Sequence, residues 1–287
     1  MHTSSKTTST GLTPLQNFSV SRASTALEER RNSDVFDELS MNDWNRIHQA
    51  YLTEIKQTNP SAHQFLNERI SSSASSSKVA ATAVDSLVDF LRASAQSDRP
   101  LVMPSEIVDT MWRGVIKHEP VLYREFCEKF MGKEIHRSEH NSFAASSKKP
   151  GFGDRLCETW VALYRNAGVL PSDSCAPPLF ATDANCRMPG GRAFSSVDGQ
   201  VFHTDLDTKG KSNKIRSYHP DITLERMNEM KLLSDAELAS GSKVRALENS
   251  RFNRIMTLLG APDNLAKEKL YINKSSRHVY RLPSEQA

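Results

Sequence analysis

The stretch LVMPSEIVDTMWRGVIKHEPVLYREFCEKFMGKEIHRSEHN, residues 101–141, decides the fold class of this chain. Pro104 and the serine after it are typical of a helix start, and apolar residues then recur at helical spacing up to Trp112. A second helical period begins at Pro120 and is closed by Gly132 as a C-cap. We therefore expect two consecutive amphipathic helices within a mainly α-helical protein.

Helical periodicity continues on both sides of this stretch. Large apolar residues recur at helical spacing over 44–55, 84–91 and 156–164. Ser40, with Asp43 three residues later, predicts the start of the first of these helices. We expect one core built on the aromatic residues of the helices: Trp44, Tyr51, Phe90, Trp112, Tyr123, Phe126, Phe130, Trp160 and Tyr164.

Two segments interrupt the helical pattern. Residues 137–153 are polar and rich in Ser, Lys and Gly, which predicts a loop. Residues 171–192 contain four prolines and two glycines, which predicts an extended connector. The connector therefore marks the expected end of the helical module.

The remaining C-terminal part predicts a small α+β region. Asp198-Gly199 is a favoured two-residue turn and predicts a hairpin. A second hairpin is expected between Tyr271–Ile272 and Val279–Leu282. The expected organisation is a leader over residues 1–37, a helical module over 38–190 and an α+β region over 191–287.

The helical module resembles the glycine-rich-domain-containing-protein-like family of plants and bacteria. That family has a Pro-Ser/Thr start, a Val-Asp-x-x-Trp-His-x-His element, a Tyr-x-x-Phe/Asp-Cys element and an Ile/Leu-His-His close. A later Thr-x-x-x-Tyr-x-x-x-Phe-Gly-x-x-Pro element follows. The matching residues here are Pro104, Ser105, Val108, Asp109, Trp112, Tyr123, Phe126, Cys127, Phe130, Gly132, Ile135, His136, Thr159, Tyr164, Gly168 and Pro171.

This chain departs from that pattern at the histidines. The Trp-His-x-His element is Trp112-Arg113-Gly114-Val115 here, and the closing pair keeps His136 but has Arg137 beside it. If the family's histidines bind a metal or carry protons, this chain has largely lost that ability. The resemblance implies a helical scaffold and no reaction.

Residues 1–37 form a polar leader. The first 27 residues contain twelve Ser or Thr, and the first acidic residue is Glu28. This composition predicts a disordered tail. It also resembles the export segment of a bacterial type III secreted effector, which would be made in the bacterial cytoplasm and delivered to a host cell. An organellar transit peptide fits less well, because Lys6 and Arg22 are the only Lys/Arg among those 27 residues.

The charge distribution and the hydrophobic content indicate which kinds of partner and membrane association the chain could have. The formal charge is +3, but residues from Lys209 onward hold 15 Lys+Arg against 9 Asp+Glu, a local excess of +6. This end of the chain is expected to meet an acidic partner or to be a solvated surface. No apolar run reaches the roughly 18 residues of a membrane span, so none is expected.

The cysteines leave a catalytic alternative open. The four cysteines form no Cys-x-x-Cys pair, so neither a zinc site nor a secreted disulfide framework is expected. Cys186, His203 and Asp205 stand in an order compatible with a nucleophile, its base and an orienting acid. They would form a cryptic hydrolase or transferase, against the alternative of an indifferent loop thiol.

Metal and cofactor chemistry is not expected. His203, Asp205 and His278 could form an iron triad, but that chemistry needs a many-stranded double sheet that the sequence does not predict. His136 and His140 would share a helix face only if the helix continued past Gly132.

Residues 207–220 are predicted to form a basic loop. Its cations could neutralise phosphates and Tyr218 could stack on a base, although no nucleic-acid-reading motif accompanies them. The candidate polyanion contacts are Lys209, Lys211, Lys214 and Arg216.

Three functions are therefore compatible with the sequence. We favour a non-catalytic module that binds an unidentified protein, with a host protein as one candidate. The alternatives are the cysteine-dependent enzyme and the nucleic-acid binder. The motif residues carried by the family resemblance are Asp109, Trp112, Tyr123, Cys127 and His136.

Overall fold

The computed structural model describes residues 35, 38–70, 73–197, 199–213, 215–243, 245, 271–273 and 278–280. The leader expected over residues 1–37 lies outside this part of the chain except for Val35, which is buried in the core. The described protein is mainly helical with a small antiparallel sheet toward the C-terminus, which confirms the predicted fold class.

The helices are α3 (Met41–Thr58), α4 (Pro60–Ile70), α5 (Ser73–Gln96), α6 (Glu106–His118), α7 (Pro120–Met131), the 3-10 turn η1 (Glu139–Asn141), α8 (Phe143–Ser146), α9 (Phe152–Asn166), α10 (Pro178–Cys186) and α11 (Leu224–Glu229). The strands are β1 (Arg192–Val197), β2 (Gln200–Asp205), β3 (Ser217–His219), β4 (Tyr271–Asn273) and β5 (His278–Tyr280).

The stretch that decided the fold class forms α6 and α7 as predicted. The Ser105 side chain accepts a hydrogen bond from the Val108 N–H and so caps α6, while Gly132 closes α7 with a φ of 72°. The Trp112 Nε1 donates to the Tyr123 hydroxyl at 2.8 Å, and that hydroxyl donates to the Ile135 carbonyl. These bonds join α6, α7 and the chain that follows.

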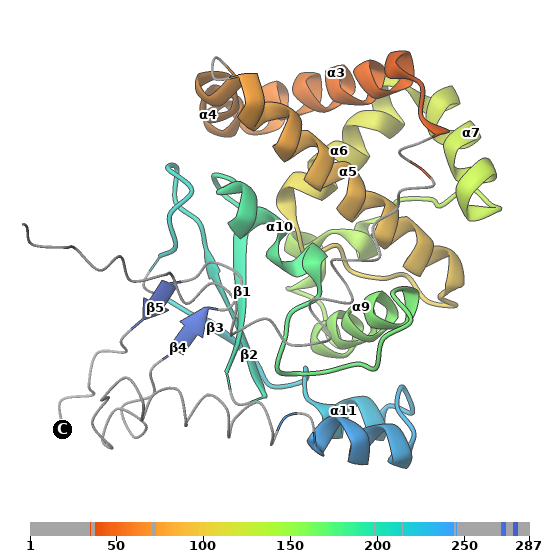
Figure 1. Ribbon diagram of the computed structural model, residues 1–287, viewed down its shortest axis with the longest axis vertical. Coiled ribbons are helices and arrows are strands. Elements are labelled where there is room, and N and C mark those ends of the chain that lie inside the picture. Colours follow the sequence, from red (N-terminus) through yellow and green to blue (C-terminus); the bar gives the residue numbers. More distant parts are fainter. Residues whose placement is uncertain are drawn as a thin grey trace, which may run out of the picture.

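The helices pack into one bundle, and the sheet stands beside it with α10 between α5 and β1 (Figure 1). Gly114 allows α6 to lie close to α3, because a Cβ there would come within 2.7 Å of the Ala50 carbonyl oxygen. The predicted aromatic core is buried, except that Trp44 and Phe130 are only partly buried at its edge.

The first predicted hairpin is confirmed. Strands β1 and β2 pair antiparallel with Phe194 opposite His203, and Gly199 of the turn has a φ of 75°. Strand β3 then pairs antiparallel with β2, with His219 opposite Val201. Because β3 lies inside residues 207–220, the prediction of a continuous loop there was wrong. Three residues of strand are too few to show their alternation in the sequence.

The prediction of an extended connector over 171–192 was also wrong, because this segment contains α10. Pro178 lies in the first helical turn, where its missing N–H costs no hydrogen bond. Leu179 and Phe180 are buried and fix the helix against the bundle. The residues before α10 are anchored to α9, since the Trp160 Nε1 donates to the Ser172 carbonyl at 2.7 Å.

The loop predicted over 137–153 contains two short helices, η1 and α8. Serines start them: the Ser138 backbone N–H donates to the Asn141 side chain in a capping box, and the Ser142 side chain accepts from the Ala145 N–H. The prediction of an irregular segment was therefore wrong here, because its serines act as helix caps.

The second predicted hairpin is confirmed, because β4 pairs with β5. Ser234 and Glu237 form the reciprocal capping box of the helical residues 235–243. One hydrophobic core runs from α3 through Phe194 and Val201 to Leu233, so the boundary expected at residue 190 does not separate two cores.

Among the described residues, none of the helices is both long enough and apolar enough to span a membrane.

Candidate functional site

The junction between α10 and β1 is organised by one buried carboxylate, that of Asp183. It accepts hydrogen bonds from the Ser105 hydroxyl at 2.7 Å and from three backbone N–H groups, those of Glu106, Ile107 and Arg192, at 2.8–3.0 Å. These donors lie at the start of α6 and of β1, so the carboxylate stabilises both element starts. Because all four of its hydrogen-bond donors belong to the protein, we interpret the role of Asp183 as structural.

The inner face of β2 and β3 holds a buried histidine pair. The Nδ1 of His203 lies 2.7 Å from the Nε2 of His219, so one ring donates an N–H to the other. Phe194 lies against both rings, with centroid distances of 5.4 and 5.7 Å, and Phe143 and Phe152 close the cage. The pair therefore satisfies its own polar groups inside an aromatic cluster.

Both histidines are neutral near pH 7. Burial lowers the pKa of His203 to about 4, with a smaller contribution from the Arg192 guanidinium. Burial lowers the pKa of His219 to about 3, with a smaller contribution from His203. Arg192 lies over the Phe143 ring at 4.1 Å from its centroid, so the cage also stacks on a cation.

The expected catalytic set is only partly assembled. The Nε2 of His203 lies 3.9 Å from the Asp205 carboxylate, which is beyond hydrogen-bond distance. In a triad the other ring nitrogen would face the nucleophile. Here that nitrogen faces His219. Cys186 is buried at the end of α10. Burial raises the pKa of the Tyr51 phenol of α3, with a smaller contribution from Cys186.

The other cysteines are buried as well. Burial raises the pKa of the Cys127 thiol and raises the pKa of Cys157 to about 12, so both are held as thiols rather than as reactive thiolates at neutral pH. Cys175 is buried in the segment before α10. Among the described residues, no group of three or more His, Cys, Asp or Glu side chains could hold a metal ion.

The family-motif residue Asp109 is held by two arginines. Arg137 forms a two-pronged ion pair with it at 2.9 and 3.0 Å, and Arg113 approaches it at 3.6 Å. These are two of the positions at which the resembled family has histidines. His136 itself is 82% exposed beside Glu134, away from this cluster. The arginines therefore make an ion-pair network at Asp109.

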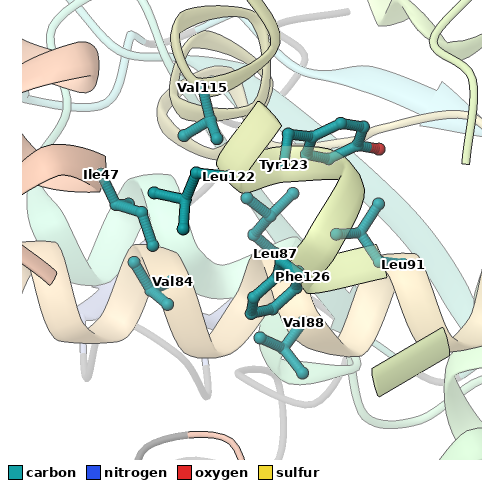
Figure 2. A pocket seen from close by; sticks show the side chains of 9 residues that line it. All are labelled: Ile47, Val84, Leu87, Val88, Leu91, Val115, Leu122, Tyr123 and Phe126. Carbon is teal, nitrogen blue, oxygen red and sulfur yellow. The ribbon is translucent and has the colours of Figure 1, made fainter. Parts of the chain in front are cut away.

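An apolar hollow lies between α3, α5, α6 and α7. It leaves about 20 Å³ of free space, roughly the room for one water molecule. Figure 2 shows the hydroxyl of Tyr123 pointing away from the other side chains, so the walls are apolar. We interpret the hollow as a packing defect, because it is too small for a ligand. It is lined by Ile47, Val84, Leu87, Val88, Leu91, Val115, Leu122, Tyr123 and Phe126.

The outer face of β2 and β3 is different. The ring of Tyr218 lies 5.1 Å from that of Phe202, and the Tyr218 side chain is 47% exposed. Ile215, just before β3, is 82% exposed. Lys209 and Lys211 are exposed in the loop between the two strands. We call Lys209, Lys211, Ile215 and Tyr218 together the β3 surface.

Two of the four expected polyanion contacts belong to this surface. Arg216 is half-buried, and Lys214 lies outside the described residues.

Comparison with known proteins adds one finding: residues 49–226 match the model of the UCP032817-like family. The chain belongs to the UCP032817-like family. No curated protein and no solved structure matches it.

The UCP032817-like match runs from within α3 to within α11. It therefore includes the three-stranded sheet, the histidine pair and the β3 surface, and it extends beyond the helical module expected to end at residue 190. The sequence alone did not single out His219, Asp183 or Arg192. Their hydrogen-bond partners lie between 9 and 88 residues away in the sequence, and no local spacing signals them.

Proposed function

We propose that this UCP032817-like chain is a non-catalytic protein-interaction module and that the β3 surface is where it binds its partner. One observation supports this most strongly. Among the described residues, the large exposed hydrophobic side chains are Met41, Val121, Ile215 and Tyr218, and the last two are three residues apart. Exposed apolar residues close together in sequence, here at the start of β3 and after a loop with two exposed lysines, are a feature expected of an interaction site.

The chemistry of the polar residues supports the same conclusion. Asp183 accepts four hydrogen bonds from the protein, and Asp109 is held by arginines. His203 faces His219 where an enzyme would present a nucleophile. In this proposal, the groups that resemble catalytic residues have structural roles as hydrogen-bond and ion-pair partners within the protein.

We further propose that the partner belongs to a host cell and that the leader directs export from a bacterium. The Ser/Thr-rich, initially acid-free composition of residues 1–27 supports this. A reporter fused to residues 1–37 tests it in bacteria with and without a working type III apparatus. Export that depends on the apparatus is expected. Equal retention in both strains would remove the export proposal and leave the binding proposal intact.

The binding proposal is tested by site-specific crosslinking of the full chain. A photoreactive residue replaces Thr208, which is exposed in the loop between β2 and β3, and the protein is illuminated in extracts of bacterial and host cells. We expect a discrete adduct that disappears in the I215S/Y218S variant. The adduct should persist in V121S, a matched control that changes an apolar side chain 58% exposed on α7.

The enzymatic alternative makes the opposite predictions. A thiol-reactive probe would label Cys186 rapidly at neutral pH, and the label would be lost in H203A. We expect slow labelling of Cys186 that does not respond to this substitution. Rapid labelling dependent on His203 would contradict the non-catalytic proposal.

A further inference from the structure

Strand β3 lies at the edge of the three-stranded sheet and is attached by few buried side chains. It pairs antiparallel with β2, and of its three residues Ser217 and Tyr218 are exposed, whereas His219 is buried. The neighbouring strands β1 and β2, by contrast, bury Phe194 and Val201 completely. The attachment of β3 to the bundle therefore depends mainly on one inward side chain, that of His219.

His219 makes its inward contacts with aromatic rings and with a second histidine. Its Nε2 lies 2.7 Å from the Nδ1 of His203, and its ring centroid lies 6.3 and 5.7 Å from those of Phe152 and Phe194. One proton between the two histidine rings satisfies this hydrogen bond, so the neutral pair fits the cage. A further proton would place a positive charge in a buried, aromatic environment, which is unfavourable.

The charged groups around the pair do not compensate for such a charge. From β1, the Arg192 guanidinium acts on His203 and lowers its pKa in addition to the effect of burial. From β2, the Asp205 carboxylate lies 3.9 Å from the His203 Nε2 but is 69% exposed, so water screens it. The Asp221 carboxylate, just after β3, lies against Gly153. Helices α8 and α9 contribute phenylalanine rings.

The chain is anchored on both sides of β3. Before the strand, the Asn213 N–H donates to the Asp205 carbonyl at 3.0 Å. After the strand, Ile222 is fully buried and the Leu224 N–H donates to the buried Asp173 carboxylate at 3.1 Å. Strand β3 can therefore leave the sheet while the chain on both sides stays attached.

We propose that the histidine pair is an acid-sensitive switch, in which proton uptake by His203 and His219 between pH 7 and 5 releases β3 from the cage. Once the strand is released, each ring meets water and regains the ordinary histidine pKa of 6.5, so acid favours the released form. Release would also separate Tyr218 from Phe202, because their contact depends on the pairing of β3 with β2. Control of binding at the β3 surface by this switch rests on the proposed function, whereas the release of β3 does not.

Hydrogen exchange of the full chain at pH 7, 6 and 5 tests the release. Mass spectrometry compares peptides that cover β3 with peptides that cover α6, after correction for the pH dependence of chemical exchange. We expect β3 to open more readily than α6 at each pH, and its opening to increase by about fiftyfold from pH 6 to 5 if both histidines take up a proton. Equal opening of β3 and α6 would overturn the proposal, because β3 would then open only when the whole protein unfolds.

Variants assign this response to the pair. H203F/H219F should remove the increase, and H219Q, which keeps a polar side chain if the double variant does not fold, should reduce it to about sevenfold. The matched control is H136Q, which changes a histidine that is 82% exposed and should leave the response as in the wild type. An unchanged response in H203F/H219F and H219Q would overturn the proposal.

The crosslinked adduct formed from position 208 separates the switch from the proposed function. We expect the wild type and H136Q to lose the adduct between pH 7 and 5, and H203F/H219F to keep it. If no adduct forms at any pH, the proposed function fails, and hydrogen exchange still decides whether β3 is released. If β3 is released but the adduct is unaffected, the pair does not control binding and that part of the proposal is overturned.

Discussion

Strands β2 and β3 carry two opposite environments on neighbouring residues. His203 and His219 point into an aromatic cage, whereas Phe202 and Tyr218, one residue away on each strand, pack together on the outer face. The alternation of a β-strand makes this possible, because successive side chains lie on opposite faces. The inner residues therefore fix the sheet to the bundle, and the outer face is where we propose that a partner binds.

The largest effect is expected from breaking the inner cage. Phe194 is fully buried and lies against Phe180, His203 and His219. Phe194→Ala should lower the free energy of unfolding by about 3–5 kcal/mol, because it removes a buried ring and leaves a cavity. Urea unfolding followed by tryptophan fluorescence measures the change. A loss below about 1 kcal/mol would show that the cage does not hold the sheet to the bundle.

Acidification is expected to weaken the same inner face. The folded-state pKa values of about 4 and about 3 lie below the ordinary value of 6.5, so the unfolded chain takes up protons first as the pH falls. Stability due to the neutral pair is complete above pH 6.5 and declines below it, levelling only below pH 3. From pH 7 to 5 we expect a loss of about 2–4 kcal/mol.

The control for this pH dependence replaces both histidines by residues that do not titrate. The double variant H203F/H219F should show a shallower decline of unfolding free energy between pH 7 and 5 than the wild type does. If both proteins lose stability in parallel, other groups carry the pH dependence. Isothermal urea titrations across this pH range distinguish these results.

The outer region has one residue on which its shape depends. Gly210 adopts a φ of 67° and lies against the Arg187 carbonyl. Gly210→Ala should cost about 1–3 kcal/mol, because it combines an unfavourable backbone conformation with an overlap. The same change at Gly132, which also has a positive φ but where an added Cβ would meet nothing within 4 Å, should cost only the backbone part, about 1 kcal/mol. Equal costs would mean that the loop is not fixed to α10.

The sequence predicted the features that rest on local chemistry. The sequence predicted the caps at Ser105 and Gly132 and the hairpin turn at Gly199 from the conformations that these residues favour. It predicted the burial of Trp112 from helical periodicity. Local patterns need no knowledge of the fold, so they were predicted well.

The features that were missed depend on contacts between distant segments. Helix α10 was hidden by its prolines, since its burial against α5 and β1 is not visible locally. The Asp183 carboxylate caps α6 from 78 residues away in sequence, and His219 finds its partner 16 residues earlier. The expected set of Cys186, His203 and Asp205 failed to predict His219 for the same reason: chain order does not determine which side chain faces a ring nitrogen.

A smaller effect is expected from filling the hollow shown in Figure 2. Val88 is fully buried on its wall, and the free space accommodates one further methyl group. Val88→Ile should raise the free energy of unfolding by about 0.5–1 kcal/mol, because an added methylene would fill space rather than displace neighbours. Thermal unfolding measures the gain. A loss of stability would show that the hollow has no room for the added methylene group.

The smallest effect on stability is expected at the outer face of β2 and β3. Ile215 is 82% exposed, so Ile215→Ser removes little buried area and should change the free energy of unfolding by less than about 0.5 kcal/mol. Tyr218→Ser should cost slightly more, because its ring packs on Phe202. Urea unfolding of each variant measures both changes. Such a small change would agree with the proposal that Ile215 makes its contact outside the molecule. A loss of about 2 kcal/mol or more in Ile215→Ser would instead make it part of the fold and remove the main support for binding at the β3 surface.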